Sequence, residues 1–214
     1  RGHEVDVIHD IDAYRLLSRH PNPDPVSEPA GLQVFGMQSR MGALSCLATQ
    51  QLGRPVFHGR EIARILRDRR HDVIHYHNIS LVGGPGILGY GDAIKLYTAH
   101  EHWLVCPTHV LWRHNREPCN EKQCLRCVLN YRRPPQLWRN TGLLSRQLRH
   151  VDEFCSPSHF SANKHREYGF PRAMEVLPSF IPDAVPAQPE NGPAPAARPY
   201  FLFVGRLEKI KGLD

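Results

Sequence analysis

The stretch of sequence that decides the fold is residues 58–77, HGREIARILRDRRHDVIHYH. In its first part Ile62, Ile65 and Leu66 recur at the spacing of one helix face, while arginines occupy the opposite face, as in an amphipathic helix. Its second part, residues 72–77, is a short β-branched run typical of the buried strands of parallel sheets. The stretch therefore predicts a surface helix that leads directly into a buried strand.

The same alternation of strands and helices continues on both sides of this stretch. Helical spacing recurs over residues 137–148, and Ser158 is placed to cap a helix that extends to about residue 168. Further segments have strand character and lead into polar residues: 4–9, 93–99, 151–155 and 173–177. We therefore expect an α/β protein with a Rossmann-like parallel sheet covered on both faces, which binds ligands at the carboxyl ends of its strands.

The composition changes abruptly toward the end of the chain. Residues 182–199 contain six prolines and predict an extended, semi-rigid linker. Residues 200–204, YFLFV, predict a new apolar strand. We expect a first domain over residues 1–181 and the start of a second domain over residues 200–214. Because the chain begins with Arg and ends without a signal for the end of a folded unit, we also expect a piece of a longer protein.

Composition excludes several classes of protein. The chain has 214 residues, of which 41% are apolar and 22% charged, which excludes wholesale disorder, collagen and coiled coil. The apolar stretch 83–99 is interrupted by Asp92 and Lys95, so it is not a membrane-spanning helix. The first twelve residues lack the apolar core of a signal peptide, and we therefore expect a cytoplasmic protein.

The net charge of +6 favours anionic partners such as phosphates, acidic glycans, nucleic acid or an anionic membrane surface. The excess is concentrated in residues 113–149, which we call the basic segment. It either contacts an anionic partner or is simply solvated. The acidic residues of this segment are Glu117 and Glu121. Its nine basic residues are Arg113, Arg116, Lys122, Arg126, Arg132, Arg133, Arg139, Arg146 and Arg149.

Four of the six cysteines cluster in the sequence at Cys106, Cys119, Cys124 and Cys127. The two-residue gap in the last pair lets both thiolates reach one ion at about 2.3 Å, and four such ligands satisfy tetrahedral Zn²⁺ in a closed structural site. Disulfides are a competing interpretation, which the absence of a secretion signal disfavours. Reduced or redox-active thiols are the remaining alternative.

Three histidines stand at or near predicted strand ends. His75 and His77 flank Tyr76 with period two, so they lie on one side of a strand, either as half of a metal site or as packed, hydrogen-bonded histidines. His100 directly follows the strand 93–99 and is succeeded by Glu101. Because ligands bind at strand ends, His100 is a candidate site residue, with an ordinary loop histidine as the alternative.

Residues 203–212, FVGRLEKIKG, carry the last candidate site. A strand ends, Gly205 turns the chain, and Arg206 and Lys211 are spaced to converge on one anion beside the next helix. The alternative is a surface charge pair. One cation 4 Å from one phosphate charge contributes about 4 kcal/mol at an effective dielectric of 20, before desolvation. An interaction of that size is sufficient to decide catalysis, whereas a solvent-exposed pair contributes almost nothing.

These motifs resemble glycosyltransferase family 4, the retaining enzymes of the GT-B fold. Residues 203–212 resemble the signature that opens the second domain of that family, and residues 72–78 resemble its strand ending in HxHN. Residues 97–107, YTAHEHWLVCP, are similar to its TxHD segment with the WLxCP extension of a Cys-rich subgroup. Residues 154–160 and 176–183 resemble the closing strand and turn of its acceptor domain.

The resemblance implies two Rossmann-like domains across a cleft, the first holding an acceptor and the second a nucleotide sugar. It places His100 near the donor sugar, and Arg206 and Lys211, after Gly205, on the departing diphosphate. It implies transfer with retention to a glycan or lipid-linked acceptor. No metal is needed for the transfer, so a metal at the cysteines would be architectural. On this expectation the chain is the acceptor domain plus the first strand of the donor domain, and is inactive by itself.

A second hypothesis comes from another class: a zinc-stabilised module whose basic segment binds nucleic acid or an anionic membrane. Trp138 would then stack on a base or lie at the interface. We favour the enzyme and therefore do not expect a nucleic-acid partner. In the enzyme, the basic segment is interpreted as contact with an anionic acceptor or with the inner face of a membrane.

Overall fold

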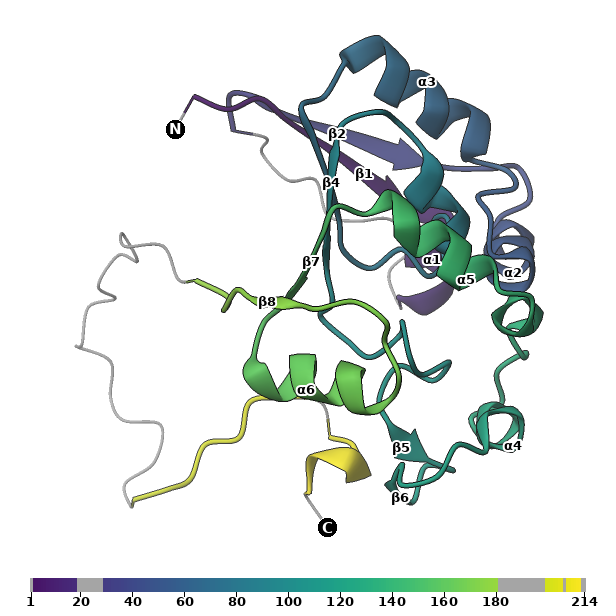
Figure 1. Ribbon diagram of the computed structural model, residues 1–214, viewed down its shortest axis with the longest axis vertical. Helices are drawn as coiled ribbons and strands as arrows, with labels where there is room; N and C mark the ends of the chain where they lie inside the picture. The colour runs from purple at the N-terminus through teal and green to yellow at the C-terminus, as the bar shows by residue number, and fades with distance from the viewer. Residues whose placement is uncertain (1, 19–28, 181–198, 206, 213–214) are drawn as a thin grey trace.

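The computed structural model of the protein describes residues 2–18, 29–180, 199–205 and 207–212 (Figure 1). Its central sheet has four strands in the order β3-β4-β7-β8, and every neighbouring pair is parallel. The predicted α/β fold with a parallel sheet is therefore confirmed. The strands of this sheet are β3 (Val73–Tyr76), β4 (Ile94–Thr98), β7 (Glu153–Ser156) and β8 (Glu175–Val176).

A second, two-stranded parallel sheet precedes the central sheet in the chain. It pairs β1 (Val5–Asp10) with β2 (Leu32–Met37). Helix α1 (Ile11–Leu17) follows β1 directly, because the Asp10 carboxylate accepts a hydrogen bond from the Ala13 N–H at 3.0 Å and so caps the helix. Helix α2 (Ala43–Leu52) packs against α1.

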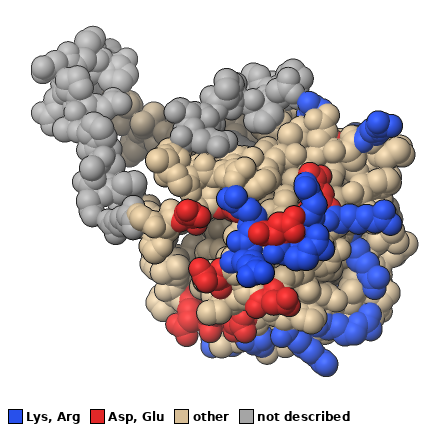
Figure 2. All heavy atoms as spheres, turned by 90° about the horizontal axis from the view of Figure 1, so that it is seen from above, with Lys and Arg blue, Asp and Glu red and all other residues tan. Residues whose placement is uncertain are grey.

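Helix α3 (Gly59–Arg69) is the amphipathic helix that the sequence predicts. Ile62 and Ile65 are buried, and the helix ends at Arg70, which adopts a left-handed conformation with φ of 50°. Ion pairs join Glu61 to Arg64 and Asp68 to Arg67 on its outer face. The view from above accordingly shows acidic and basic side chains intermixed (Figure 2). This face is therefore not a purely basic surface.

The segment between β4 and β7 differs from the continuous helix predicted over residues 137–148. It is divided into η2 (Leu137–Asn140), α5 (Leu143–Gln147) and η3 (Leu148–His150), with η2 and η3 in 3₁₀ geometry. The break occurs because Gly142 is left-handed, with φ of 68°, and a regular α-helix does not continue through that conformation. Helix α5 packs on the 3₁₀ turn η1 (Pro85–Gly89).

Helix α6 (His159–Glu167) follows β7 and confirms the predicted cap. The Ser158 hydroxyl accepts a hydrogen bond from the Ser161 N–H at 3.2 Å. The helix packs against β7 and β8 (Figure 1). Between these helices and the central sheet lies the apolar core, in which Leu88, Trp103 and Phe154 are almost completely buried.

A small subdomain interrupts the α/β alternation between β4 and η2. It consists of the antiparallel hairpin β5 (Trp112–Arg113) and β6 (Glu117–Pro118), followed by α4 (Cys124–Asn130). In Figure 1 it lies beyond one end of the central sheet. It contains three of the four clustered cysteines, and Cys106 precedes it.

Two further expectations concern the end of the chain. The predicted linker 182–199 lies outside the described residues, apart from its last position. Residues 200–204 form no strand, contrary to the prediction, and Phe201 and Val204 are exposed. In the described part of the chain no strand runs beside them, and a strand without a partner has no ladder of hydrogen bonds to hold it. The short 3₁₀ turn η4 (Lys209–Lys211) follows.

Among the described helices, none has both the length and the apolar character that crossing a bilayer requires.

Candidate functional site

Parallel pairing brings the residues that follow β3 and β4 to one edge of the central sheet. Tyr76 pairs in register with Tyr97, so His77 and His100 emerge at this carboxyl edge. Ligands of parallel α/β sheets bind outside the carboxyl ends of the strands. The sequence-predicted His100 therefore lies where a substrate site is expected in this fold.

His77 and His100 form a hydrogen-bonded pair of imidazoles. His77 Nδ1 lies 2.8 Å from His100 Nε2, and the two rings stack with centroids 5.1 Å apart. Both residues are exposed, so the pair faces solvent at the sheet edge. A hydrogen bond between two ring nitrogens requires one donor and one acceptor, so the pair carries one proton between these two atoms.

His75 belongs to the same side of β3. Its Nε2 lies 2.8 Å from the Thr98 hydroxyl, and its ring centroid is 4.2 Å from that of His77. His75 is therefore hydrogen-bonded, as one of the two interpretations expects, but it is exposed and not packed in the core. Burial and the charge of His100 lower the pKa of His75, while burial and the charges of His75 and His100 lower the pKa of His77. Both rings are therefore neutral at neutral pH.

These histidines do not bring three potential metal-ligand atoms within 4.8 Å of one another in the described structure. The geometry consequently favours hydrogen bonding over a three-histidine metal site.

The loop after His100 is anchored although His100 itself is exposed. Glu101 pairs with His109, with 2.7 Å between Oε1 and Nδ1. His102 is stacked on the buried His165, and burial together with the charge of His165 lowers the pKa of His102 to about 4. Trp103 is 1% exposed. The loop is therefore held by the Glu101–His109 pair and by the packed side chains of His102 and Trp103.

A half-buried arginine also holds this loop. The Arg139 guanidinium lies over the Trp103 and Trp138 rings, 5.4 and 4.7 Å from their centroids, and donates a hydrogen bond to the Trp103 carbonyl at 2.7 Å. Its Nε–H donates to Gln136 Oε1. Burial lowers the pKa of Arg139 to about 10, which still leaves it charged at neutral pH. The sequence grouped this residue with the surface charges, whereas in the structure it is half-buried against two tryptophan rings.

The four clustered cysteines come together around the β5–β6 hairpin and α4, and all four are free thiols. Burial and the charges of the neighbouring cysteines raise the pKa of both Cys119 and Cys124. Cys106 Sγ lies 3.2 Å from the Thr108 hydroxyl, and Cys127 Sγ accepts the His114 N–H at 3.3 Å. Because all four cysteines are free, the structure does not support the disulfide interpretation. Their ligand atoms do not form a group of three within 4.8 Å.

The predicted phosphate-binding residues are not brought to His100 in the described structure. Arg206 lies outside the described residues. Gly205 is exposed, and Lys211 ends η4, where its N–H donates to the Glu208 carbonyl. Within the described part of the chain, no hydrogen bond or ion pair links Gly205 or Lys211 to the His100 loop. Their role stays a prediction.

Sequence reasoning missed a buried group of two carboxylates and an imidazole. Asp10 ends β1, Asp12 lies in the first turn of α1, and His58 immediately precedes α3. His58 Nε2 lies 3.5 Å from an Asp12 oxygen and 3.8 Å from an Asp10 oxygen. The signal was an acidic pair directly after a strand, but the sequence did not show that His58 would reach it.

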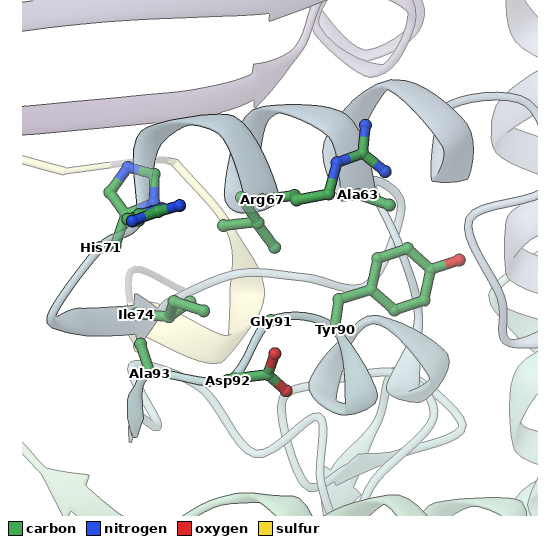
Figure 3. A pocket seen from close by; sticks show the side chains of 10 residues that line it. Ala63, Arg67, His71, Ile74, Tyr90, Gly91, Asp92 and Ala93 are labelled. Carbon is green, nitrogen blue, oxygen red and sulfur yellow. The ribbon is translucent and has the colours of Figure 1, made fainter.

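A surface pocket of about 660 Å³ lies at the opposite, amino-terminal edge of the sheet. Arg67 and His71, from α3 and the turn after it, line it on one side, and Tyr90 and Asp92, which precede β4, line it on the other (Figure 3). Because α/β sheets bind substrates at their carboxyl edge, this pocket is distinct from the candidate site around His100.

Three comparisons with known proteins bear on the family of this chain. The search of curated proteins gave no significant match, and the search of solved structures gave none either. The model of Glycosyltransferase Family 4 matches residues 1–185, which includes both parallel sheets, the histidine pair and the cysteine subdomain. The chain therefore belongs to glycosyltransferase family 4.

Proposed function

We propose that the protein that includes this chain transfers a sugar from a nucleotide-sugar donor to a glycan or lipid-linked acceptor, with retention at the anomeric carbon. Membership in the family establishes glycosyl transfer between a sugar donor and an acceptor in general terms. The observation that carries the finer proposal is the His77–His100 pair at the carboxyl edge of the sheet.

In this proposal His100 contacts the donor sugar, and His77 orients it. Because His77 Nδ1 and His100 Nε2 share a hydrogen bond, one ring nitrogen of His100 is committed and the other, Nδ1, is left for substrate. A neutral imidazole donates or accepts a hydrogen bond at a sugar hydroxyl without the cost of burying a charge beneath the substrate.

The departing diphosphate requires positive charge. Arg206 and Lys211, turned by Gly205, are the residues that we propose for this role. A guanidinium binds phosphate oxygens in a bidentate manner and an ammonium acts as a point charge, so the two stabilise the charge that develops on the leaving group.

We test the enzymatic role on protein that includes residues 1–214, using release of nucleoside diphosphate from a panel of nucleotide sugars. His100→Ala is expected to lower turnover on the order of 100-fold, as removal of one positioned hydrogen-bonding group does. Arg206→Ala and Lys211→Ala should lower turnover far more than they lower folding stability. His150→Ala, an exposed histidine away from the edge, is the matched control. Equal turnover in all four variants would defeat the assignment.

Retention is tested separately on the product. Proton NMR of a reaction with an α-linked donor should show an α-linked product, and a β-linked product would contradict retention while leaving sugar transfer intact.

The basic segment supports an anionic acceptor or membrane face as the second substrate contact. Seven of its nine basic side chains are exposed; of the other two, Arg113 pairs with Glu117 and Glu121, and Arg139 is half-buried. Leu125, Leu129 and Leu137 are exposed among them. Exposed leucines beside basic side chains suit an anionic lipid surface better than a nucleic acid. Trp138 is 4% exposed, so the predicted stacking or interfacial role of that residue is wrong.

We also retain a structural zinc ion at Cys106, Cys119, Cys124 and Cys127 as a proposal. Its support is that burial, together with the charges of the neighbouring cysteines, raises the pKa of Cys119 and Cys124, and a divalent cation would relieve the repulsion between thiolates. Arg139 supplies a half-buried positive charge that acts on Cys106 and Cys124. The ion would be architectural, and Cys124→Ser should abolish it while Cys46→Ser, at a buried thiol outside the cluster, should not.

A further inference from the structure

Asp10, Asp12 and His58, which the sequence did not bring together, form a buried cluster of ionisable side chains at the end of β1. The three side chains are 4%, 1% and 3% exposed. They come from three elements: the end of β1, the first turn of α1 and the residue before α3. Local sequence therefore does not account for their meeting, and the cluster is a product of the tertiary fold.

Two polar atoms in this cluster have no hydrogen-bond partner among the described residues. They are Asp10 Oδ2 and His58 Nε2, and both are fully shielded from solvent. A buried polar group without a partner costs free energy, and native proteins pair almost all such groups with protein, water or an ion. The His58 ring is moreover aimed at the two carboxylates, because its unpartnered nitrogen is the atom that approaches both.

The separations fit ligands of one ion better than they fit hydrogen bonds. His58 Nε2 lies 3.5 Å from Asp12 Oδ2 and 3.8 Å from Asp10 Oδ1, and one ligand atom from each residue lies within 4.8 Å of the others. These distances exceed a normal N–H···O hydrogen bond of about 2.7–3.2 Å. With metal–ligand bonds of about 2.0–2.2 Å, the ligands of a tetrahedral ion are about 3.3–3.6 Å apart.

Neighbouring groups hold the carboxylates in place. Asp12 Oδ2 accepts hydrogen bonds from the Ser39 N–H at 2.9 Å and from the hydroxyls of Ser39 and Ser45 at 2.6 and 2.8 Å. Asp10 Oδ1 accepts the Ala13 N–H at 3.0 Å. Groups that orient ligands in this way are typical of the surroundings of protein metal sites.

Charge balance favours a divalent cation in this place. Two ionised carboxylates and a neutral imidazole carry a charge of −2, and the described surroundings offer no lysine or arginine ion pair to either carboxylate. We propose that Asp10, Asp12 and His58 bind one divalent transition-metal ion, for which Zn²⁺ is the best match to a donor set of one imidazole and two carboxylates. The ion would join β1 and α1 to α3 beside the carboxyl edge of the first sheet.

The rival occupant is a proton. A protonated His58, together with one protonated carboxyl group, would also neutralise the cluster. The two occupants are separable because zinc binding is saturable and stoichiometric in metal at constant pH, whereas protonation follows pH alone.

The first test uses the full chain freed of metal with a chelator. Titration with ZnCl₂ in a calorimeter should show a site that survives in the double variant Cys124→Ser, Cys127→Ser, and Zn²⁺ should raise the thermal midpoint of that variant. Co²⁺ bound there should lack the charge-transfer absorption of thiolate ligands. A thermal midpoint that follows pH but ignores Zn²⁺ would overturn the proposal, and so would Co²⁺ binding solely through thiolates.

The second test removes single ligands in the same double-variant background. His58→Gln and Asp12→Asn should each weaken Zn²⁺ binding at least about 100-fold, because loss of a direct ligand costs no less than the upper range for loss of an orienting neighbour. His71→Gln is the matched control, since His71 also lies 2.8 Å from an aspartate but belongs to no three-ligand group. Equal Zn²⁺ affinity in all three variants would place the ion elsewhere and overturn the assignment.

Discussion

At the scale of single residues, the feature with the greatest consequence is the contact between two imidazoles at the edge of the central sheet. Neither His77 nor His100 is buried, yet each restricts the other through a 2.8 Å hydrogen bond. In an exposed position a lone histidine samples several rotamers, and ordering it costs conformational entropy. Here the hydrogen bond between the two rings orders them in the free protein, so this entropic cost does not fall on substrate binding.

The role of His77 in the proposed transfer predicts a difference between two substitutions. His77→Phe should lower turnover about tenfold or more, because the ring keeps its volume but loses the hydrogen bond to His100. His77→Asn, whose side chain can still donate or accept, should recover part of the loss. The measurement is kcat and KM for donor in both variants, and identical kcat in the two would show that His77 only fills space.

The same pair predicts how activity depends on pH. The pKa values of His75 and His77 are lowered, so in the folded protein the rings stay neutral to a lower pH than free histidine, whose pKa is about 6.5. Activity should persist just below that pH and fall as further acidification protonates His77, because its ring can then no longer accept a hydrogen bond from His100. A pH–rate profile with loss of activity only on the alkaline side would contradict this.

Arg139 carries a second residue-scale prediction, this time for stability. Arg139→Lys keeps the charge but loses the planar contact with two tryptophan rings and at least one hydrogen bond, so we expect a loss of about 1–3 kcal/mol in the free energy of unfolding. Urea denaturation measures it. The exposed Arg126→Lys is the control and should change stability by less than about 0.5 kcal/mol.

At the scale of elements, side-chain caps mark the start of α1 and α6, and ion pairs attach one element to another. Ser158→Ala removes the side-chain cap of α6 and should cost about 1 kcal/mol of folding free energy. Ser145→Ala, at an exposed position inside α5, should be neutral or slightly stabilising because alanine favours a helix. Equal thermal midpoints for the two variants would show that the cap is not what holds α6.

The attachment of β1 to the end of α3 should be sensitive to acid. Asp6 accepts hydrogen bonds from Arg69 at 2.7 and 2.9 Å and lies 2.8 Å from His71, and the Arg69 bond is the main cause of its lowered pKa. A carboxyl group with a lowered folded pKa contributes stability above its unfolded value, near 3.8, and loses it as pH falls through the folded value. Asp6→Asn should therefore remove part of the acid dependence of unfolding below about pH 4. If the variant lost stability in acid in the same way as the original protein, the Asp6 contact would not be what attaches β1 to the end of α3.

At the scale of the whole molecule, charge is distributed unevenly. Acidic and basic side chains are intermixed on the face seen in Figure 2, whereas the basic segment carries seven exposed cations against two glutamates that pair with Arg113. The exposed leucines of α4 and η2 lie in the same segment. Exposed basic and exposed apolar side chains therefore occur together in and around the cysteine subdomain.

We therefore expect the protein to sediment with vesicles that contain anionic lipid, and to be released as salt rises from 50 to 200 mM, because surface charge pairs are screened over about 10 Å at 0.1 M. Leu125→Ser with Leu129→Ser should weaken binding to vesicles, whereas Leu177→Ser, an exposed leucine after β8, should not. Binding of single-stranded nucleic acid that exceeds vesicle binding would favour the alternative class of partner.

Local sequence was sufficient for the elements whose stability is local. The amphipathic helix over residues 59–69, the cap at Ser158, the parallel strands and the exposed strand-end position of His100 all follow from periodicity, cap chemistry and the geometry of parallel sheets. The sequence did not predict contacts between segments that lie far apart in the chain. These are the hydrogen bond of His77 to His100, the packing of Arg139 against two tryptophans, and the approach of His58 to Asp10 and Asp12. Periodicity reports which face of an element is apolar, but a polar side chain obtains its partner only when the packing of other elements brings one within about 3 Å.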